Sequence, residues 1–290
     1  MRSQARYGRG CRLIIALWFT LAATPLAGCL SSETFEAHSQ YVWETAALLE
    51  YGGDNGIGGD YPTRTLNALG SSQRQRGERR EDRVRGTASI VGFAGLDQGQ
   101  SVAAFSDDFL IRAISAVVGR EGSITVWRPT ELVRTHGNVR GNSEAVERLR
   151  NVSIDHSAPA ALSLPSGLDV VLSADTHHAL HIEGLPHGTA AAVNAAVFRA
   201  LLPGGSYVII DVHAADGSGT SGVDRLHRIE VASVIAEVEA AGFVLEDQEG
   251  LFTAAEDART APAYPAAGPR STRFLLKFRK PRRPALEDMP

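Results

Sequence analysis

The sequence predicts an α/β protein with a doubly wound, mainly parallel sheet. From residue 87 onward, short apolar strands alternate with helices of apolar periodicity, which is typical of parallel strands joined by helical crossovers. Residues 206–211 form an almost continuous apolar run, as expected for a strand that is covered on both faces. The strong hairpin signals of an all-β protein are missing. We therefore expect a sheet with helices on both sides.

The individual elements follow from local patterns and from the residues that end them. We expect strands at residues 101–105, 123–127, 152–154, 168–172, 206–211, 243–246 and 272–278. We expect helices at residues 109–118, 143–149, 188–202 and 231–241. Gly119 and Gly242 stand where helices commonly end, Ser143 can cap the start of one helix, and Pro203-Gly204-Gly205 stops another.

Three segments precede this alternating pattern. Residues 41–51 are apolar at helical spacing and predict a helix. The glycine-rich residues 52–59 predict a loop, because glycine costs a helix roughly 1 kcal/mol per position. Residues 72–85 interleave six arginines with three acidic residues, which suits an exposed helix. That helix is either an anion-binding face or a solvated surface, and the sequence favours the solvated surface.

The N-terminus has the pattern of an export signal. Four arginines precede the apolar run 13–23, and Leu26-Ala27-Gly28 leads directly to Cys29. A basic start, a short apolar middle and small residues before a cleavage point are typical of a secretory signal. The run is too short to span a membrane comfortably. The segment Leu26-Ala27-Gly28-Cys29 resembles the lipobox of bacterial lipoproteins. This resemblance implies that Cys29 is acylated and that the exported protein is anchored at the periplasmic side. The alternative is an ordinary signal with a chance cysteine.

Composition limits the classes of partner. The chain has 29 basic and 33 acidic residues, a formal net charge of −4, and it becomes more acidic once the arginines of the signal are removed. This balance argues against a general affinity for nucleic acid. Cys11 lies in the signal and Cys29 is the predicted lipid attachment point, so no thiol remains for a disulfide, a nucleophile or a zinc-thiolate site.

The order of elements resembles a class I S-adenosylmethionine-dependent methyltransferase. The unit at residues 198–211, in which a helix is followed by Pro-Gly-Gly and an apolar strand, is especially similar. More narrowly, the chain resembles a bacterial group of exported, predicted methyltransferases in residues 91–96, 118–124, 217–219, 226–229, 237–243 and 272–281. The resemblance implies a seven-stranded sheet. We expect a signal at 1–28, a tether and helical extension at 29–86, the α/β domain at 87–281 and a tail at 282–290.

The resemblance also implies S-adenosylmethionine as cofactor, bound at the carboxyl ends of the first strands, where the sheet order reverses. The loop at this place contains no glycine, and the second strand leads into Arg128 rather than into a carboxylate. Asp107 or Asp108 is then the candidate acceptor for ribose hydroxyls, and Asp155 matches a polar position on the adenine side. The candidate cofactor site comprises Phe105, Ser106, Asp107, Asp108, Arg128, Asp155 and Ser173.

His178 and His227 are the candidate catalytic residues. His178 matches a histidine that the family has after the fourth strand, and Ala179 stands where the family has an acid. The sequence therefore predicts an imidazole without a carboxylate to orient it, which is a weaker general base than a paired one. His227 and Arg228 either line the same pocket or bind the loop above it to the scaffold.

Two other chemistries are less favoured. His177 and His181 are four residues apart and would share one face of a helix, as metal ligands can, but no His-Glu-x-x-His motif is present and we predict no metal site. Residues 217–222 lack the Gly-x-Ser-x-Gly spacing of a serine hydrolase. The expected function is an exported, membrane-anchored methyltransferase-like enzyme acting on an unknown small molecule. The alternative is an inactive methyltransferase fold that serves as a binding or scaffold module.

Overall fold

The computed structural model describes residues 63–70, 74, 76–132, 143–251, 257–263 and 271–282, all within the unit Tyr51–Pro290. The predictions of an export signal, of acylation at Cys29, of a helix at 41–51 and of a loop at 52–59 lie outside these residues. In the described part of the chain, no helix is both long and apolar enough to cross a membrane.

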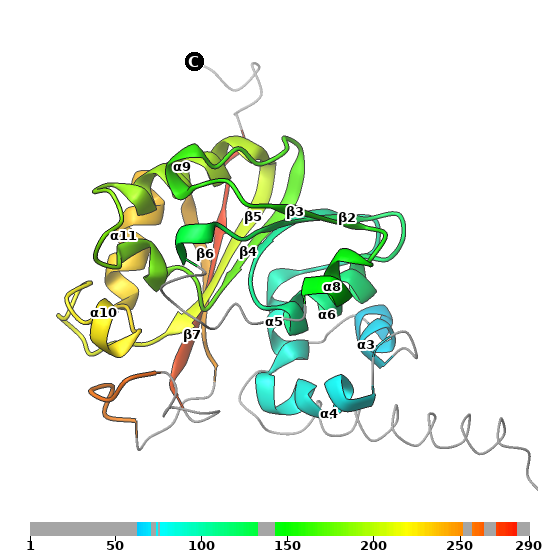
Figure 1. Cartoon of the computed structure of the whole chain (residues 1–290), viewed down its shortest axis with the longest axis horizontal. Helices are drawn as coiled ribbons and strands as arrows, with labels where there is room; N and C mark the ends of the chain where they lie inside the picture. Colours follow the sequence, from blue (N-terminus) through cyan, green and yellow to red (C-terminus); the bar gives the residue numbers. More distant parts are fainter. Residues whose placement is uncertain are drawn as a thin grey trace, which may run out of the picture. The chain divides into compact units, whose positions relative to one another are not determined.

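Seven strands of the described residues form one sheet (Figure 1). They are β1 (Ser101–Phe105), β2 (Ser123–Trp127), β3 (Val152–Asp155), β4 (Leu168–Ala174), β5 (Leu201–Val212), β6 (Val244–Leu251) and β7 (Arg273–Arg279). Their spatial order is β3-β2-β1-β4-β5-β7-β6, and within this sheet only β7 runs antiparallel to its neighbours. The predicted fold class, a doubly wound and mainly parallel sheet, is confirmed.

Side chains alternate between the two faces of the sheet. In β1, Ala103 and Phe105 join one apolar core, whereas Val102 and Ala104 join the other. Helices α9 (Thr189–Ala200) and α11 (Val231–Ala240) cover the first face, and α5 (Thr87–Ala94) and α6 (Asp108–Val118) cover the second (Figure 1). Both faces of the central strands are therefore buried, which explains their continuous apolar sequence.

Shorter helices complete the fold. These are α3 (Thr63–Gly70), α4 (Arg76–Arg85), α8 (Ser143–Glu147), α10 (Val223–Leu226) and the 3₁₀ turns η2 (Pro159–Ala161) and η3 (His178–His181). The α3 helix packs against α5 and α6, and α4 packs against α5. Turn η3 lies between β4 and α9. It contains His178 and His181, and His177 directly precedes it.

The prediction of a wholly exposed helix at residues 72–85 is wrong for one of its faces. Arg74, Glu78 and Asp82 are buried. Arg74 pairs with Asp82 at 2.6 Å, and Glu78 pairs with Arg112 of α6. The regular alternation of charges therefore hides a set of inward ion pairs that hold this segment against the domain.

Two element boundaries differ from the sequence prediction. The alanine-rich helix ends at Ala200 rather than at residue 202, because Leu201 already pairs with Leu168 of β4. A register shift then separates this pair from the regular ladder, and Pro203, Gly204 and Gly205 lie within the irregular start of β5. Strand β6 continues to Leu251, beyond the predicted end at residue 246.

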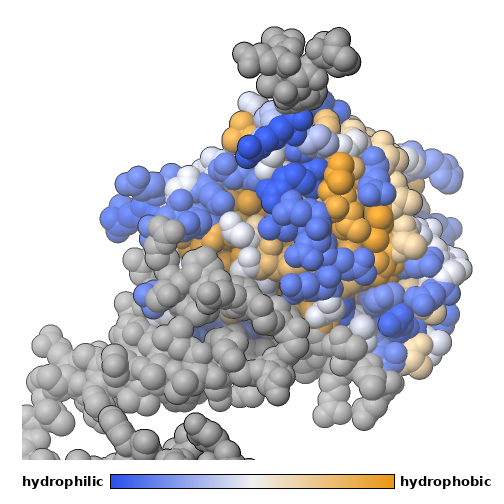
Figure 2. All heavy atoms as spheres, turned by 180° about the vertical axis from the view of Figure 1, so that it is seen from behind, coloured by the Kyte–Doolittle hydropathy of each residue, from blue (hydrophilic) through white to orange (hydrophobic). Residues whose placement is uncertain are grey.

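Figure 2 shows the molecule from behind, with mostly hydrophilic residues on the visible described surface, one larger hydrophobic band and several smaller hydrophobic areas. In the described residues, the large hydrophobic side chains that are strongly exposed are Leu202 at 44 % and Val244 at 55 %. The other large apolar side chains of the strands contribute to the two cores.

Candidate functional site

The carboxyl ends of the parallel strands meet at one edge of the sheet. The chain order reverses at β1, which pairs with β2 on one side and with β4 on the other. Ligand sites of open α/β sheets lie outside the carboxyl ends at this reversal. The loop after β1, Arg128 after β2, η3 after β4 and Asp211 near the end of β5 all belong to this edge.

His178 and Asp211 are joined by two hydrogen bonds at this edge. His178 Nδ1 donates to Asp211 Oδ1 at 2.7 Å, and the backbone N–H of His178 donates to Oδ2 at 2.8 Å. Both side chains are fully buried. The prediction of an imidazole without a carboxylate partner is therefore wrong, because the acid comes from β5 rather than from the position next to His178.

The pKa values of this pair shift in opposite directions. Burial acts to lower the pKa of His178, but the charge of Asp211 and the hydrogen bond to it outweigh burial and raise this pKa. Burial acts to raise the pKa of Asp211, whereas the charge and hydrogen bonds of His178 lower it below its ordinary value. The protein therefore favours the imidazolium and carboxylate forms of the pair.

His227 lies beside this pair and is only partly buried. Its ring centroid is 5.8 Å from that of His178, and the two rings are nearly perpendicular. Burial and the charge of His178 lower the pKa of His227, which favours its neutral form. His227 also has a left-handed backbone with φ of 50°, a conformation that costs a non-glycine residue about 1–3 kcal/mol.

Arg228 holds the segment that follows His227. Its guanidinium donates to both carboxylate oxygens of Asp257 at 2.9 Å and to the carbonyls of His213 and Ala261. Arg228 is buried, so it belongs to the scaffold rather than to an open pocket. Of the two alternatives that the sequence leaves open for this segment, the scaffold role therefore applies to Arg228.

The loop at residues 217–222 is held by Glu230. The carboxylate of Glu230 accepts hydrogen bonds from the backbone N–H groups of Gly217 at 2.6 Å and Gly219 at 2.7 Å. These bonds lower the pKa of Glu230 below its ordinary value. The glycine-rich loop, which lacks the spacing of a serine hydrolase, is therefore fixed by an acid at the start of α11.

The two carboxylates of the predicted cofactor loop already bind other groups of the protein. Asp107 caps α6 by accepting from the N–H of Leu110 at 2.9 Å, and it also pairs with Arg85 at 2.7 Å. Asp108 forms an ion pair with Arg128, and each of these two side chains is 4 % exposed. The buried Asp108 carboxylate is therefore not an open acceptor for a ribose, and the Asp107 carboxylate, which is 39 % exposed, is already engaged by Leu110 and Arg85.

Aromatic side chains fill the adjoining space between β1 and β2. The rings of Phe105 and Trp127 meet edge to face with centroids 4.7 Å apart, and both are buried. Ser106 is partly exposed and lies between β1 and the start of α6. Ser173 is buried within β4, where it pairs with Phe105, rather than following the strand.

Asp155 ends β3 and is also engaged locally. Its carboxylate accepts from the backbone N–H of Ser157 at 2.8 Å and from the Ser157 hydroxyl at 2.9 Å. The strand end thus supplies a carboxylate, as the sequence predicts, but one that already stabilises its own turn. Together with the glycine-free loop and the Asp108–Arg128 pair, these contacts do not fit the cradle that S-adenosylmethionine needs.

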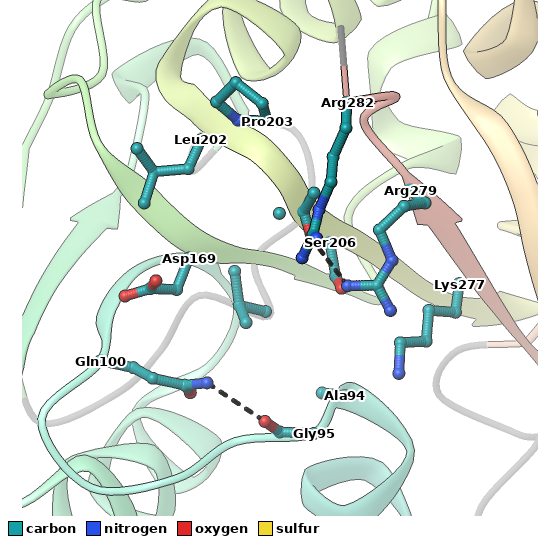
Figure 3. A pocket seen from close by; sticks show the side chains of 13 residues that line it. Ala94, Gly95, Gln100, Asp169, Leu202, Pro203, Ser206, Lys277, Arg279 and Arg282 are labelled. Carbon is teal, nitrogen blue, oxygen red and sulfur yellow. Dashed lines mark hydrogen bonds between the residues drawn. The ribbon is translucent and has the colours of Figure 1, made fainter. Parts of the chain in front are cut away.

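A cavity of about 360 Å³ lies at the opposite edge of the sheet (Figure 3). Lys277, Arg279 and Arg282 line one side of it, and Asp169 and Gln100 line the other. Arg279 is bound to Glu246 and to the carbonyl of Gly204. This cavity adjoins the amino ends of β4 and β5, so it is separate from the histidines at the carboxyl edge.

Asp211 is the functional candidate that sequence reasoning missed. The sequence shows it as the acidic end of an apolar strand, and it lies 33 residues beyond His178. Strands β4 and β5 are neighbours in the sheet, and this pairing brings their carboxyl ends together. An acid at the end of one strand and a histidine just after its neighbour are the pattern that points to such a pair.

No protein-family model and no curated protein matches the chain. Among solved structures, the [4+2]-cyclase SpnF has a TM-score of 0.50 and 16 % identity, over 76 % of this chain and 93 % of that one. A methyltransferase from Aquifex aeolicus that depends on S-adenosylmethionine has a TM-score of 0.49 and 17 % identity, over 69 % and 92 %. The N-methyltransferase NodS from Bradyrhizobium japonicum, solved with S-adenosylhomocysteine, has a TM-score of 0.46 and 14 % identity, over 79 % of this chain and 100 % of that one.

Likeness at such low identity establishes a fold and no activity. The chain accordingly has a class I methyltransferase-like α/β fold, with a mostly parallel sheet and one antiparallel strand.

Proposed function

We propose that the chain is a methyltransferase-like enzyme whose reaction depends on proton transfer at His227. The observation that supports this most is the doubly bonded, buried His178–Asp211 pair beside the partly exposed ring of His227. All three residues gather near the carboxyl edge of the sheet, where this fold class places its chemistry. The substrate class is a small molecule with an O–H or N–H group that must lose its proton.

The roles follow from exposure. His178 has no exposed side-chain surface, so it does not meet a substrate, although the sequence alone favours it as the base. His227 reaches the surface and is the group that accepts the substrate proton. Asp211 fixes the ring of His178, and His178 in turn packs against His227. His178 and Asp211 are therefore positioning residues, and His227 is the catalytic one.

The cofactor that the resemblance implies is S-adenosylmethionine, which when bound would supply a methyl group. The residues at its expected place do not fit, because Asp108 is bound to Arg128 and Asp107 caps its own helix. We therefore assign no step to this cofactor. The fold itself allows other reactions, since the similar structure with the TM-score of 0.50 is named a cyclase.

Carbethoxylation of histidines tests the assignment of His227. The full chain is treated with diethyl pyrocarbonate, and modified peptides are quantified by mass spectrometry. We expect His227 to react in the folded protein, with the exposed His187 as a positive control, while His178 stays protected until unfolding. Equal protection of His227 and His178 would mean that no substrate can reach either ring, and the proposal would be abandoned.

A separate titration tests the cofactor. Calorimetry of the full chain with S-adenosylmethionine and S-adenosylhomocysteine is expected to show no binding at millimolar ligand. Micromolar binding that weakens in Asp155→Ala would show that the cradle opens, and methyl transfer would then be the reaction at His227. An unreactive His227 together with absent cofactor binding would favour the second candidate, a binding or scaffold module with a filled cofactor cradle.

We propose further that the protein is exported and anchored to a membrane at the periplasmic side through Cys29. The Leu26-Ala27-Gly28-Cys29 sequence supports this, and several acyl chains at roughly 0.8 kcal/mol per buried methylene suffice for a stable anchor. Cys29→Ser should release the protein from membranes in cell fractionation. Cys11→Ser, within the same signal, is the matched control and should leave the protein membrane-bound. Membrane retention of Cys29→Ser would contradict the anchor.

A further inference from the structure

A second cluster of titratable side chains lies on the other side of η3. His181 is the last residue of η3, His177 directly precedes this turn, and Glu237 comes from α11. In the described part of the chain, these three residues are the only His, Cys, Asp or Glu group whose ligand atoms all lie within 4.8 Å of one another. None of them takes part in the His178–Asp211 pair.

The distances within this cluster are close to those of a metal site. His177 Nε2 lies 2.5 Å from Glu237 Oε1, and His181 Nε2 lies 3.2 and 3.1 Å from the two carboxylate oxygens. Ligand atoms around a tetrahedral Zn²⁺ with bonds of about 2.0–2.1 Å are about 3.3 Å apart. The His177 nitrogen and the Glu237 oxygen therefore need to separate by less than about 1 Å to hold an ion, and the His181–Glu237 distances already match.

Burial and charge indicate the kind of metal and the kind of site. His177 is fully buried, whereas the side chains of His181 and Glu237 are 18 % and 21 % exposed. Two imidazoles and one carboxylate suit Zn²⁺ and similar divalent transition ions. Three protein ligands with one edge toward solvent are typical of catalytic zinc sites, since structural sites have four protein ligands.

We propose that His177, His181 and Glu237 bind one divalent transition-metal ion of the zinc type, with a coordination position open to solvent. The proposal does not depend on the function assigned to His227. The alternative is a purely structural hydrogen-bonded network that connects His177 and His181 to α11. The two differ in whether the protein takes up a metal at all.

Cobalt is the probe for this site, because its visible absorption reports coordination. The full chain, without a polyhistidine tag, is titrated with Co²⁺ and then with Zn²⁺. We expect one equivalent of Co²⁺ to produce the intense visible bands of a low-coordinate site and Zn²⁺ to displace it. Zn²⁺ should also raise the melting temperature, since it binds the folded state preferentially. No spectral change at millimolar Co²⁺ would overturn the proposal.

Variants locate the site. Glu237→Gln and His181→Ala should each weaken binding by more than about 100-fold, because even an outer-shell partner is worth roughly 10–100-fold in affinity. His187→Ala, at an exposed histidine, and His227→Ala should bind as the wild type does. His181→Ala keeps the test valid if Glu237→Gln does not fold, since His181 is partly exposed. Wild-type affinity in His181→Ala, or loss of binding only in His227→Ala, would refute this ligand set.

Discussion

Asp108 and Arg128 form a buried ion pair across the carboxyl ends of β1 and β2. Asp108 comes from the first turn of α6, and Arg128 directly follows β2. The pair thus takes a place where a ligand of this fold class is expected, and it replaces a ligand contact with a contact inside the protein. The remaining carboxylate oxygen of Asp108 is buried without a partner among the described residues.

Removing Arg128 alone should be costly. Arg128→Ala leaves the Asp108 charge buried, and breaking such a pair from one side typically costs about 3–5 kcal/mol. The double variant Asp108→Leu, Arg128→Met removes both charges and should recover most of that loss. Urea unfolding followed by circular dichroism measures both values. Equal free energies of unfolding for Arg128→Ala and the wild type would show that the pair is not structural.

The His178–Asp211 bond should have a spectroscopic signature. A ring proton held between Nδ1 and a buried carboxylate is expected at low field in the proton NMR spectrum of the wild type. Asp211→Asn weakens the acceptor, so that resonance should move upfield or disappear, and the free energy of unfolding should fall by about 3–5 kcal/mol. His187→Ala is the control. A low-field resonance that survives in Asp211→Asn would place the proton elsewhere.

Asp257 should make stability depend on acid. Burial acts to raise its pKa, but hydrogen bonds from Arg228, Thr272 and Arg259 outweigh burial and lower it below the ordinary value of 3.8. A lowered folded pKa means that the carboxylate stabilises the protein fully above pH 3.8 and less as the pH falls through the folded pKa. The free-energy difference between wild type and Asp257→Asn should therefore be constant at higher pH and shrink below pH 3.8. Urea unfolding over this range checks the sign, and a difference that grows in acid would contradict it.

Two glycines should respond in opposite ways to alanine. A Cβ at Gly122 would lie 2.7–2.8 Å from Gln100 O, Val118 Cβ and Val118 O, so Gly122→Ala should cost about 1–3 kcal/mol of stability. A Cβ at Gly77, in the α4 helix, would meet nothing within 4 Å, so Gly77→Ala should stabilise the protein by up to about 1 kcal/mol. Thermal unfolding of both variants measures the contrast. A stabilising Gly122→Ala would show that the backbone there can shift.

Local patterns were sufficient to predict the sheet. The apolar run that ends at Asp211 and the helix that ends near Gly119 depend on residues close together in the chain, and both elements are present. The exposed helix at residues 72–85 was predicted wrongly on its inner face, because charge alternation does not reveal that Glu78 reaches Arg112 of another helix.

Pairings over long sequence distances could not be predicted. His178 gains its acid from a strand 33 residues on, and His181 meets Glu237 at a separation of 56 residues. The loop at Phe105 to Asp108 was identified by position, but Arg128 as the partner of Asp108 depends on the three-dimensional packing of β1 beside β2.

The two acids that contact His177 and His178 belong to different layers of the protein. His177 contacts Glu237 on a covering helix, and its neighbour His178 contacts Asp211 within the sheet. One inserted or deleted residue ahead of this turn would rotate both imidazoles away from their acids together. Natural variants should consequently preserve the number of residues between β4 and these histidines as strictly as they preserve the histidines themselves.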